Sequence, residues 1–359
     1  MGNQSCACLN KQEEGELNQI DSNPSVVRGA NINPQGTNQS NVLNNENTND
    51  FITKDTEALT QLFETFQSKY AEKLEIAKLT EHEYKDKLND FPHIKSFLNS
   101  PEYSSFPQSQ ESNGDLILGP PLKLTNTLSN NTEYYKGQLN KNSEMSGEGE
   151  LFTEDGNYYK GTFDNNLFNG KGIYINDKGN IYNGEWKDGK SNGEGEYTLV
   201  TGHKYKGGFK NNMKNGMGEE TSPDGTKYIG EFVDNVKHGK GEIYFPDGDK
   251  YEGMFENDEI TGEGVFTARD GRVSKGMFCN GKLNGNAITT FPDNSQYEGN
   301  YVNDLKSGSG TYRWNDGKEL NVKWVKNVPE GKGKMNIGDK EMDVIYRFGK
   351  MIQCKESTS

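Results

Sequence analysis

Cysteine is scarce in this chain of 359 residues, which has only Cys6, Cys8, Cys279 and Cys354. These residues form no C-x-x-C pair and no disulfide framework, so a structural zinc site is not expected. There are only four histidines, and no two stand four residues apart, as they would on a helix that binds a metal through two histidines. We therefore expect no metal ion and no cofactor.

Long apolar runs and an excess of positive charge are also missing. Only 30% of the residues are hydrophobic, 43 are glycine and the net charge is −14, which favours a repetitive or partly disordered chain over a large conventional core. No apolar run reaches the ~18 residues of a membrane helix, and no signal-peptide core is present, so we expect the chain to stay in the cytosol. Nucleic acid is not an expected partner, because binding its backbone needs concentrated Lys and Arg.

The features of a lipid anchor are present in the first ten residues, MGNQSCACLN. Gly2 follows the initiator Met in a small, uncharged context that resembles an N-myristoylation signal, and Cys6 and Cys8 are close enough to be S-acylated. The usual pattern has Ser or Thr at position 6, whereas here Ser5 comes one residue early. Stable anchoring takes two signals, so we predict lipidation at Gly2, Cys6 and Cys8 within residues 1–10. An unmodified terminus is the alternative.

The next segments are polar and then helical in pattern. Residues 11–50 are rich in Asn, Gln, Ser and Glu, which predicts a disordered spacer. A helical segment is expected over 53–100: an amphipathic helix at 56–79, then a second piece, EHEYKDKLNDF, that ends before Pro92. A loop is expected to follow to about Gly114. Whether these helices pack on the rest of the chain or bind a partner stays open at this stage.

From residue 135 onward the sequence repeats itself, with one interval of 24 residues and then intervals of 23. The nine copies begin at Tyr135, Tyr159, Tyr182, Tyr205, Tyr228, Tyr251, Ser274, Tyr297 and Leu320. Each opens with residues such as YNGEW, and about ten residues later comes a pair of small residues, as in Gly193 and Gly195. Residues two apart share a face of a strand, so each copy predicts a β-hairpin. Glycine weakens strands, so we expect aromatic rings to lie close over these glycines.

The pattern Y-x-G-x-[WF]-x-x-G-x-x-x-G-x-G resembles the MORN repeat family over residues 131–343. The seventh copy departs from it, with Ser274 in place of Tyr and Ala287 in place of Gly. The resemblance implies a mainly β fold, an elongated antiparallel β-hairpin repeat array, here after a disordered N-terminal tail and short α-helices. Residues 101–130 are predicted to form a loop and an N-terminal cap that includes LILGPPLKLTNTL. Residues 344–359 are predicted as the C-terminal cap and tail.

One stretch, GEWKDGKS from Gly184 to Ser191, fits the phosphate-loop pattern G-x-x-x-x-G-K-[ST]. In register with the other copies, however, Gly189 falls at a turn position that in most other copies holds Asn or Asp. The turn positions compared with it are Asn142, Asn166, Asn212, Asn235, Asp258, Gly281 and Asp304. A strand follows where a phosphate loop needs a helix, so we predict a residue of positive φ at 189 and no nucleotide site.

The resemblance also implies a class of function. MORN arrays occur in radial-spoke heads of cilia, in junctophilins that bridge membranes, in cytoskeletal proteins, and beside separate catalytic domains of some lipid kinases and a methyltransferase. The segments outside the repeats are too short for such a domain, so we expect no enzymatic activity and no catalytic residue. Charges alternate in sign along the strands, so direct phospholipid binding by the array is the weaker alternative.

Two functions stay open. In the first, the chain is a scaffold that organises partner proteins at the cytoplasmic face of a membrane or at the cell cortex, tethered by its N-terminal lipids. In the second, it is a structural subunit of a ciliary axoneme or cytoskeletal assembly, like a radial-spoke-head protein. A homodimer is compatible with both.

Overall fold

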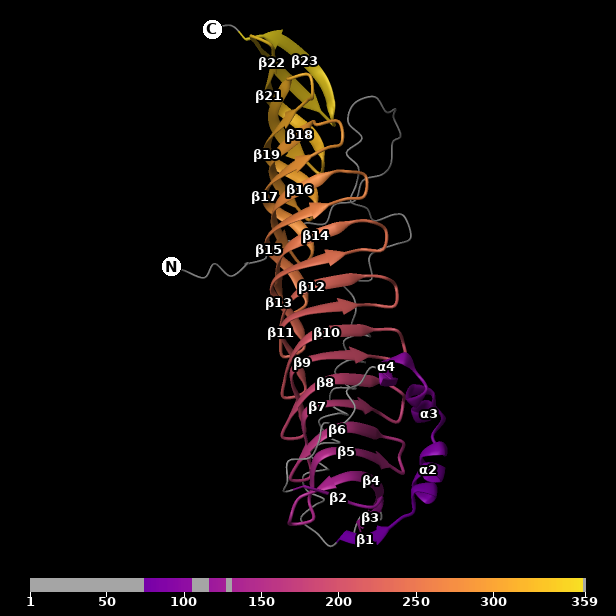
Figure 1. The fold of residues 1–359 in the computed structure, drawn as a ribbon. Coiled ribbons are helices and arrows are strands. Elements are labelled where there is room, and N and C mark those ends of the chain that lie inside the picture. The colour runs from indigo at the N-terminus through magenta and orange to yellow at the C-terminus, as the bar shows by residue number, and fades with distance from the viewer. Residues whose placement is uncertain (1–73, 105–115, 127–130, 358–359) are drawn as a thin grey trace. The chain divides into compact units, whose positions relative to one another are not determined.

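The computed structural model describes residues 74–104, 116–126 and 131–357. These residues form three short helices and one antiparallel sheet of 23 strands (Figure 1). Contacts divide the chain into two units, with the described residues up to Val236 in an N-terminal unit and those from Lys237 in a C-terminal unit. The mainly β hairpin array predicted from the repeats is confirmed.

The N-terminal unit contains the helices α2 (Glu81–Asn89), α3 (Pro92–Leu98) and α4 (Pro101–Ser104). Its strands are β1 (Leu74–Lys78), β2 (Ile117–Leu118), β3 (Leu122–Asn126), β4 (Asn131–Leu139), β5 (Met145–Thr153), β6 (Tyr158–Asp164), β7 (Leu167–Ile175), β8 (Ile181–Lys187), β9 (Lys190–Thr198), β10 (Lys204–Lys210), β11 (Met213–Thr221) and β12 (Lys227–Val233).

The C-terminal unit contains β13 (Val236–Tyr244), β14 (Lys250–Glu256), β15 (Glu259–Thr267), β16 (Val273–Cys279), β17 (Lys282–Thr290), β18 (Gln296–Val302), β19 (Leu305–Arg313), β20 (Glu319–Val325), β21 (Val328–Ile337), β22 (Lys340–Arg347) and β23 (Lys350–Glu356). Residues 344–356 of the predicted C-terminal cap and tail lie in β22, the turn that follows it and β23.

Each copy of the repeat is a hairpin whose second strand pairs with the first strand of the next copy. In the third copy, for example, Gly195 of β9 lies opposite Gly184 of β8 on one side and Gly207 of β10 on the other. Within a hairpin the register shifts after the glycine of the first strand, so that Trp186 lies opposite Ser191. This shift is a β-bulge, which bends the strand and leaves two extra residues on β9.

Glycine is required at the two paired positions for two different reasons, and the sequence predicted only one of them. Gly195 lies under the Tyr182 ring, since a Cβ added there would be 2.6 Å from the Tyr182 hydroxyl oxygen and 2.7 Å from ring carbon Cε2. Gly193, two residues earlier in the bulge, has φ +93°, which side chains rarely adopt. Ring-over-glycine packing is therefore confirmed for the second glycine of the pair, and the first is required by backbone geometry.

The leading tyrosine of a repeat copy also donates a hydrogen bond to its own strand at the bulge. The Tyr182 hydroxyl donates to the Glu185 carbonyl oxygen at 2.9 Å, and Glu185 is the residue that the hairpin register skips. The same bond to the residue three positions on is made by Tyr135, Tyr159, Tyr205, Tyr228, Tyr251 and Tyr297. A buried hydroxyl needs a partner, so tyrosine fits this position better than phenylalanine.

At the N-terminal end, β2 and β3, which belong to the predicted cap, both pair with β4 of the first hairpin. Residues 127–130 of the predicted cap lie outside the described residues. A further strand, β1, pairs with β3. The prediction of a helix over 56–79 is therefore wrong at Leu74–Lys78, where hydrogen bonding to β3 overrides the helical spacing of apolar residues. The rest of that predicted helix lies outside the described residues.

The second helical prediction is confirmed, and the loop after it is wrong in part. Thr80 caps α2 and forms a reciprocal capping box with Glu83, and α2 ends at Asn89, before Pro92. The chain does not then enter a loop, because Pro92 opens α3 and Pro101 opens α4. Proline has a φ suited to the first helical turn and needs no donor there, so it starts these helices as readily as it ends α2.

These helices cover part of the sheet in their own unit. Tyr84 of α2 and Ile94 and Phe97 of α3 are buried against a strand cluster of Tyr134, Phe152, Tyr158, Ile173 and Ile175. Figure 1 shows α2–α4 lying beside the first hairpins. Of the two options that the sequence left open, packing on the chain itself therefore applies to Glu81–Ser104.

Candidate interaction surfaces

The residues predicted to carry lipids, Gly2, Cys6 and Cys8, lie outside the described residues, as do the predicted spacer and most of the first predicted helix. Their roles remain predictions. No helix in the described part of the chain is long and apolar enough to cross a membrane. Among residues 74–104, 116–126 and 131–357, no group of three or more His, Cys, Asp or Glu side chains is placed to hold a metal ion.

The stretch GEWKDGKS, which fits the phosphate-loop pattern, contains a hairpin turn. Asp188 and Gly189 have φ of 51° and 75°, which is the two-residue turn that suits a β-hairpin, and β9 begins at Lys190. The prediction of positive φ at 189 is confirmed. The turn position is also confirmed in the later copies, whereas Asn142 is wrong: the first hairpin has a longer turn, Asn140–Glu144, with its positive φ at Ser143.

The backbone donors of this stretch are already used. The Gly189 N–H donates to the Phe168 carbonyl oxygen at 2.9 Å, and the Ser191 N–H donates to Oδ1 of Asn212 at 2.7 Å. A phosphate loop works by aiming free N–H groups at the ligand. The bonds that lock this turn to its neighbours therefore remove the donors that nucleotide binding would need.

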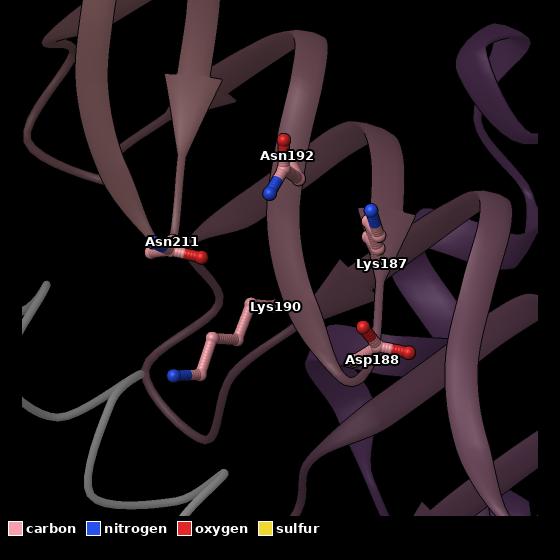
Figure 2. A pocket seen from close by; sticks show the side chains of 5 residues that line it. All are labelled: Lys187, Asp188, Lys190, Asn192 and Asn211. Carbon is pink, nitrogen blue, oxygen red and sulfur yellow. The ribbon is translucent and has the colours of Figure 1, made fainter.

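A hollow of about 320 Å³ lies beside the same turn, lined by Lys187, Asp188, Lys190, Asn192 and Asn211. Figure 2 shows the ammonium groups of Lys187 and Lys190 pointing in different directions, away from any common centre. The lining is polar and comes from two neighbouring hairpin tips. Ligand sites are mostly apolar with a few convergent polar groups, so this arrangement does not resemble one.

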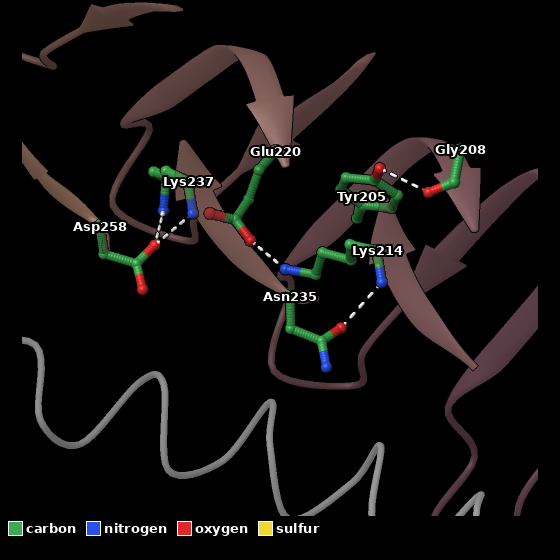
Figure 3. A network of polar contacts seen from close by, with 7 residues as sticks. All are labelled: Tyr205, Gly208, Lys214, Glu220, Asn235, Lys237 and Asp258. Atoms are coloured by element: carbon green, nitrogen blue, oxygen red, sulfur yellow. Dashed lines mark hydrogen bonds and ion pairs between the residues drawn. The ribbon is translucent and has the colours of Figure 1, made fainter. Parts of the chain in front are cut away.

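The turns connect successive copies through the side chain at the second turn position. Asn235 accepts a hydrogen bond at Oδ1 from the Lys214 N–H at 2.8 Å, and its own N–H donates to the Lys214 carbonyl oxygen at 3.0 Å (Figure 3). Asn166, Asn212, Asp258, Asp304 and Asn327 accept the same backbone bond from the preceding copy. Asn and Asp at this position therefore tolerate the turn geometry and also fasten one hairpin to the next.

We expect Asn235→Ala to lower the free energy of unfolding by about 2 kcal/mol, because it puts a Cβ residue without a compensating bond at φ 75° and leaves the Lys214 N–H unpaired. The matched control is Asn235→Gly, which keeps the φ and loses only the side-chain bond, and should cost about half as much. Urea unfolding of both variants measures the difference. Equal losses would contradict the requirement for positive φ.

Two lysines are buried in the aromatic core. Lys214 forms an ion pair with Glu220 (Figure 3). Its ammonium group lies over the rings of Tyr205 and Phe232. Lys306 is 4% exposed, and its ammonium nitrogen lies between 4.8 and 5.1 Å from the ring centres of Phe291, Tyr297, Tyr312 and Trp324. Burial, with a smaller contribution from the Arg272 charge, lowers the pKa of Lys306 to about 8. These cations belong to the core and are not accessible to a ligand.

The inner side chains of the array therefore pack against one another. The outer faces and edges of its hairpins are the surfaces exposed to other molecules. A model of the family described as MORN repeat matches residues 159–181, 182–204, 205–227, 228–250, 251–271, 275–296, 297–319 and 323–339. The chain belongs to the MORN repeat family. The first hairpin, from Tyr135, precedes the matched MORN repeats but has the same tyrosine hydrogen bond.

The other comparisons add no function to the MORN assignment. No curated protein matches the chain. Among solved structures, the TCP domain of SAS-4 (dCPAP) from Drosophila melanogaster, in complex with a proline-rich motif of Ana2 (dSTIL), is 13% identical, covers 50% of this chain and 84% of that chain, and has a TM-score of 0.23. Virginiamycin B lyase from Staphylococcus aureus is 11% identical, with 79% and 88% covered and a TM-score of 0.13. Neither likeness carries an argument.

Proposed function

We propose that the chain is a non-enzymatic scaffold whose MORN array organises partner proteins at the cytoplasmic face of a membrane or at the cell cortex. MORN repeats are interaction modules for proteins and membranes, and eight consecutive repeats are the observation that carries the proposal. Repeat arrays bind partners through extended surfaces. The hydrogen bonds and burial described above fix the inner residues in the core, so the outer surfaces of the array are the ones available for binding partners.

The proposed tether is acylation at Gly2, Cys6 and Cys8. Stable anchoring takes two signals, so loss of either the N-myristoyl group or the S-acyl groups should release the protein from the membrane. The alternative, a structural subunit of an axoneme or cytoskeletal assembly, needs no lipid and predicts no effect of these residues on location.

We expect Gly2→Ala, and separately Cys6→Ser with Cys8→Ser, to lower the membrane-associated share of the full-length protein in cells about tenfold, since stable anchoring takes two signals and each change removes one of them. Fractionation of tagged protein measures this. Cys279→Ser is the matched control, because Cys279 lies in the array strand β16, and should leave the fractions unchanged. If the Gly2→Ala protein stays in the membrane or detergent-resistant fraction at the wild-type level, the lipid tether is wrong.

A further inference from the structure

The last two hairpin turns have other residue types at the first turn position than the rest of the array. From the turn after β6 to the turn after β18, the first turn residue is Asn or Asp with φ near 50°, as at Asn165 and Asn303. The turn after β20 has Lys326 at φ 45°, and the turn after β22 has Phe348 at φ 52°. A bulky side chain at positive φ is an outlier, because Asn and Asp tolerate this region far better. Such strain persists where a side chain is needed for another purpose.

The strained residues are exposed and surrounded by other exposed apolar groups. The Phe348 side chain is 85% exposed, and Val325 and Val328, which flank the Lys326 turn, are each 42% exposed. The two turns adjoin, since the Gly349 N–H donates to the Pro329 carbonyl oxygen at 3.2 Å, and a Cβ added at Gly349 would lie 3.5 Å from Val328. We name Val325, Lys326, Val328 and Phe348 the terminal tip patch.

Positive charge surrounds this patch in a chain that is acidic as a whole. Lys323, Lys326, Arg347 and Lys350 are all exposed, and none of them forms a salt bridge with any residue that the structure describes. The nearby carboxylate of Glu330 accepts a hydrogen bond from the Phe348 N–H at 2.7 Å, which fixes the turn. The tip therefore combines an exposed aromatic ring, two exposed valines and four unpaired cations.

We propose that the terminal tip patch docks on an anionic phospholipid bilayer, with Phe348 and the valines in the interfacial layer and the four cations at the headgroups. Membrane-surface elements combine apolar side chains with Lys and Arg in this way, and anionic lipids attract each nearby cation. Charge complementarity favours a bilayer, because the exposed apolar side chains of the patch lie among four exposed cations. The inference rests on the proposed membrane role and adds a second contact with the same surface.

The test uses the full-length chain carrying Gly2→Ala, so that N-myristoylation cannot contribute, and measures co-flotation with vesicles. We expect binding to vesicles of phosphatidylcholine with phosphatidylserine, and much weaker binding to phosphatidylcholine alone. Phe348→Asn should weaken the partitioning about tenfold, and adding Lys326→Asn should abolish it, since interfacial apolar and charge contributions both fall. Asn is the residue that the other turns use, so both changes should leave thermal stability equal or higher.

Matched controls come from other exposed sites. Val200, which is 66% exposed, and Lys210, before the Asn211 turn, are changed to Asn and should leave vesicle binding unchanged. The proposal is overturned if the chain does not bind phosphatidylserine vesicles, if Phe348→Asn binds as well as its parent, or if soluble glycerophosphoserine displaces the protein, which would indicate a headgroup pocket. Every protein in this test carries Gly2→Ala, so a lack of vesicle binding would not contradict the acyl tether. Likewise, failure of the tether experiment in cells would not contradict vesicle binding by the terminal tip patch.

Discussion

Gly264→Ala is expected to lower the free energy of unfolding by about 3 kcal/mol, because its new methyl group would overlap a fixed tyrosine. A Cβ at residue 264 would lie 2.4 Å from the hydroxyl oxygen of Tyr251 and 2.5 Å from ring carbon Cε2. The ring is 0% exposed and packs edge-on against Phe255 and Phe278, so it has nowhere to move. Chemical denaturation of the single variant measures the loss.

The seventh copy shows how the sequence removes this conflict. Ser274 stands where Tyr251 stands one copy earlier, and Ala287 stands in place of Gly264. Ser274 instead shares a hydrogen bond of 3.0 Å with the Thr289 hydroxyl, which in turn contacts the hydroxyl of Tyr301 at 2.7 Å. Without the ring, alanine fits.

Tyr251→Ser combined with Gly264→Ala should therefore cost about 2 kcal/mol less than the sum of the two single changes, because residues in contact are coupled. Tyr251→Ser alone is expected to cost about 3 kcal/mol through lost burial. A double-mutant cycle measures the coupling. Strictly additive losses would mean that the ring and the glycine are not one packing unit.

Lys306→Met is expected to stabilise the protein by about 2 kcal/mol at pH 7, since an apolar side chain of similar size replaces a buried cation. The four rings offset part of the cost of burial, and no carboxylate contacts this ammonium among the described salt bridges. Thermal or urea unfolding against wild type measures the gain.

The gain should depend on pH in a defined direction. Below pH 8 the lysine is protonated in both the folded and the unfolded chain, so the whole cost is present. Between a folded pKa of about 8 and the ordinary value of 10.5, the unfolded chain binds the extra proton, and wild-type stability rises with pH relative to the variant. The advantage of Lys306→Met should shrink across that window. An advantage of Lys306→Met that stays constant across that window would contradict the argument.

Much of this fold could be predicted from the sequence, because nine copies of the repeat carry the same local pattern of residues. Tyrosine, glycine and the Asn or Asp turns recur in phase, so hairpins and the turn at Gly189 follow from spacing and residue type. The bulge could not be predicted in this way. It needs two extra residues on the second strand, and the glycine that it requires cannot be told in the sequence from the glycine under the ring.

Single segments were harder to predict than repeats. The apolar spacing around Leu74–Lys78 fits a helix, and only pairing with β3, from a distant part of the chain, makes it a strand. Pro92 was taken as the end of a helix, although it also begins one. In both cases the deciding interaction is tertiary or depends on position within a helical turn.

The terminal tip patch could not be predicted from the sequence for a different reason. Averaged along the strands, charge alternates in sign and suggests a solvated face. The signal was present in the turns, where Lys326 and Phe348 replace Asn or Asp, but it becomes visible only when the first turn residues are aligned and their φ values are known.

In the proposed function, one chain connects a membrane to other proteins through separate parts, the acylated terminus and the MORN array. Cross-linking mass spectrometry on fractionated cells that express the wild-type or the Gly2→Ala chain tests it most directly. We predict that proteins cross-linked to array residues 131–343 appear in the membrane fraction with wild type and move with the Gly2→Ala chain to the soluble fraction. An array without cross-linked partners, or partners that stay at the membrane when the chain leaves it, would contradict the account.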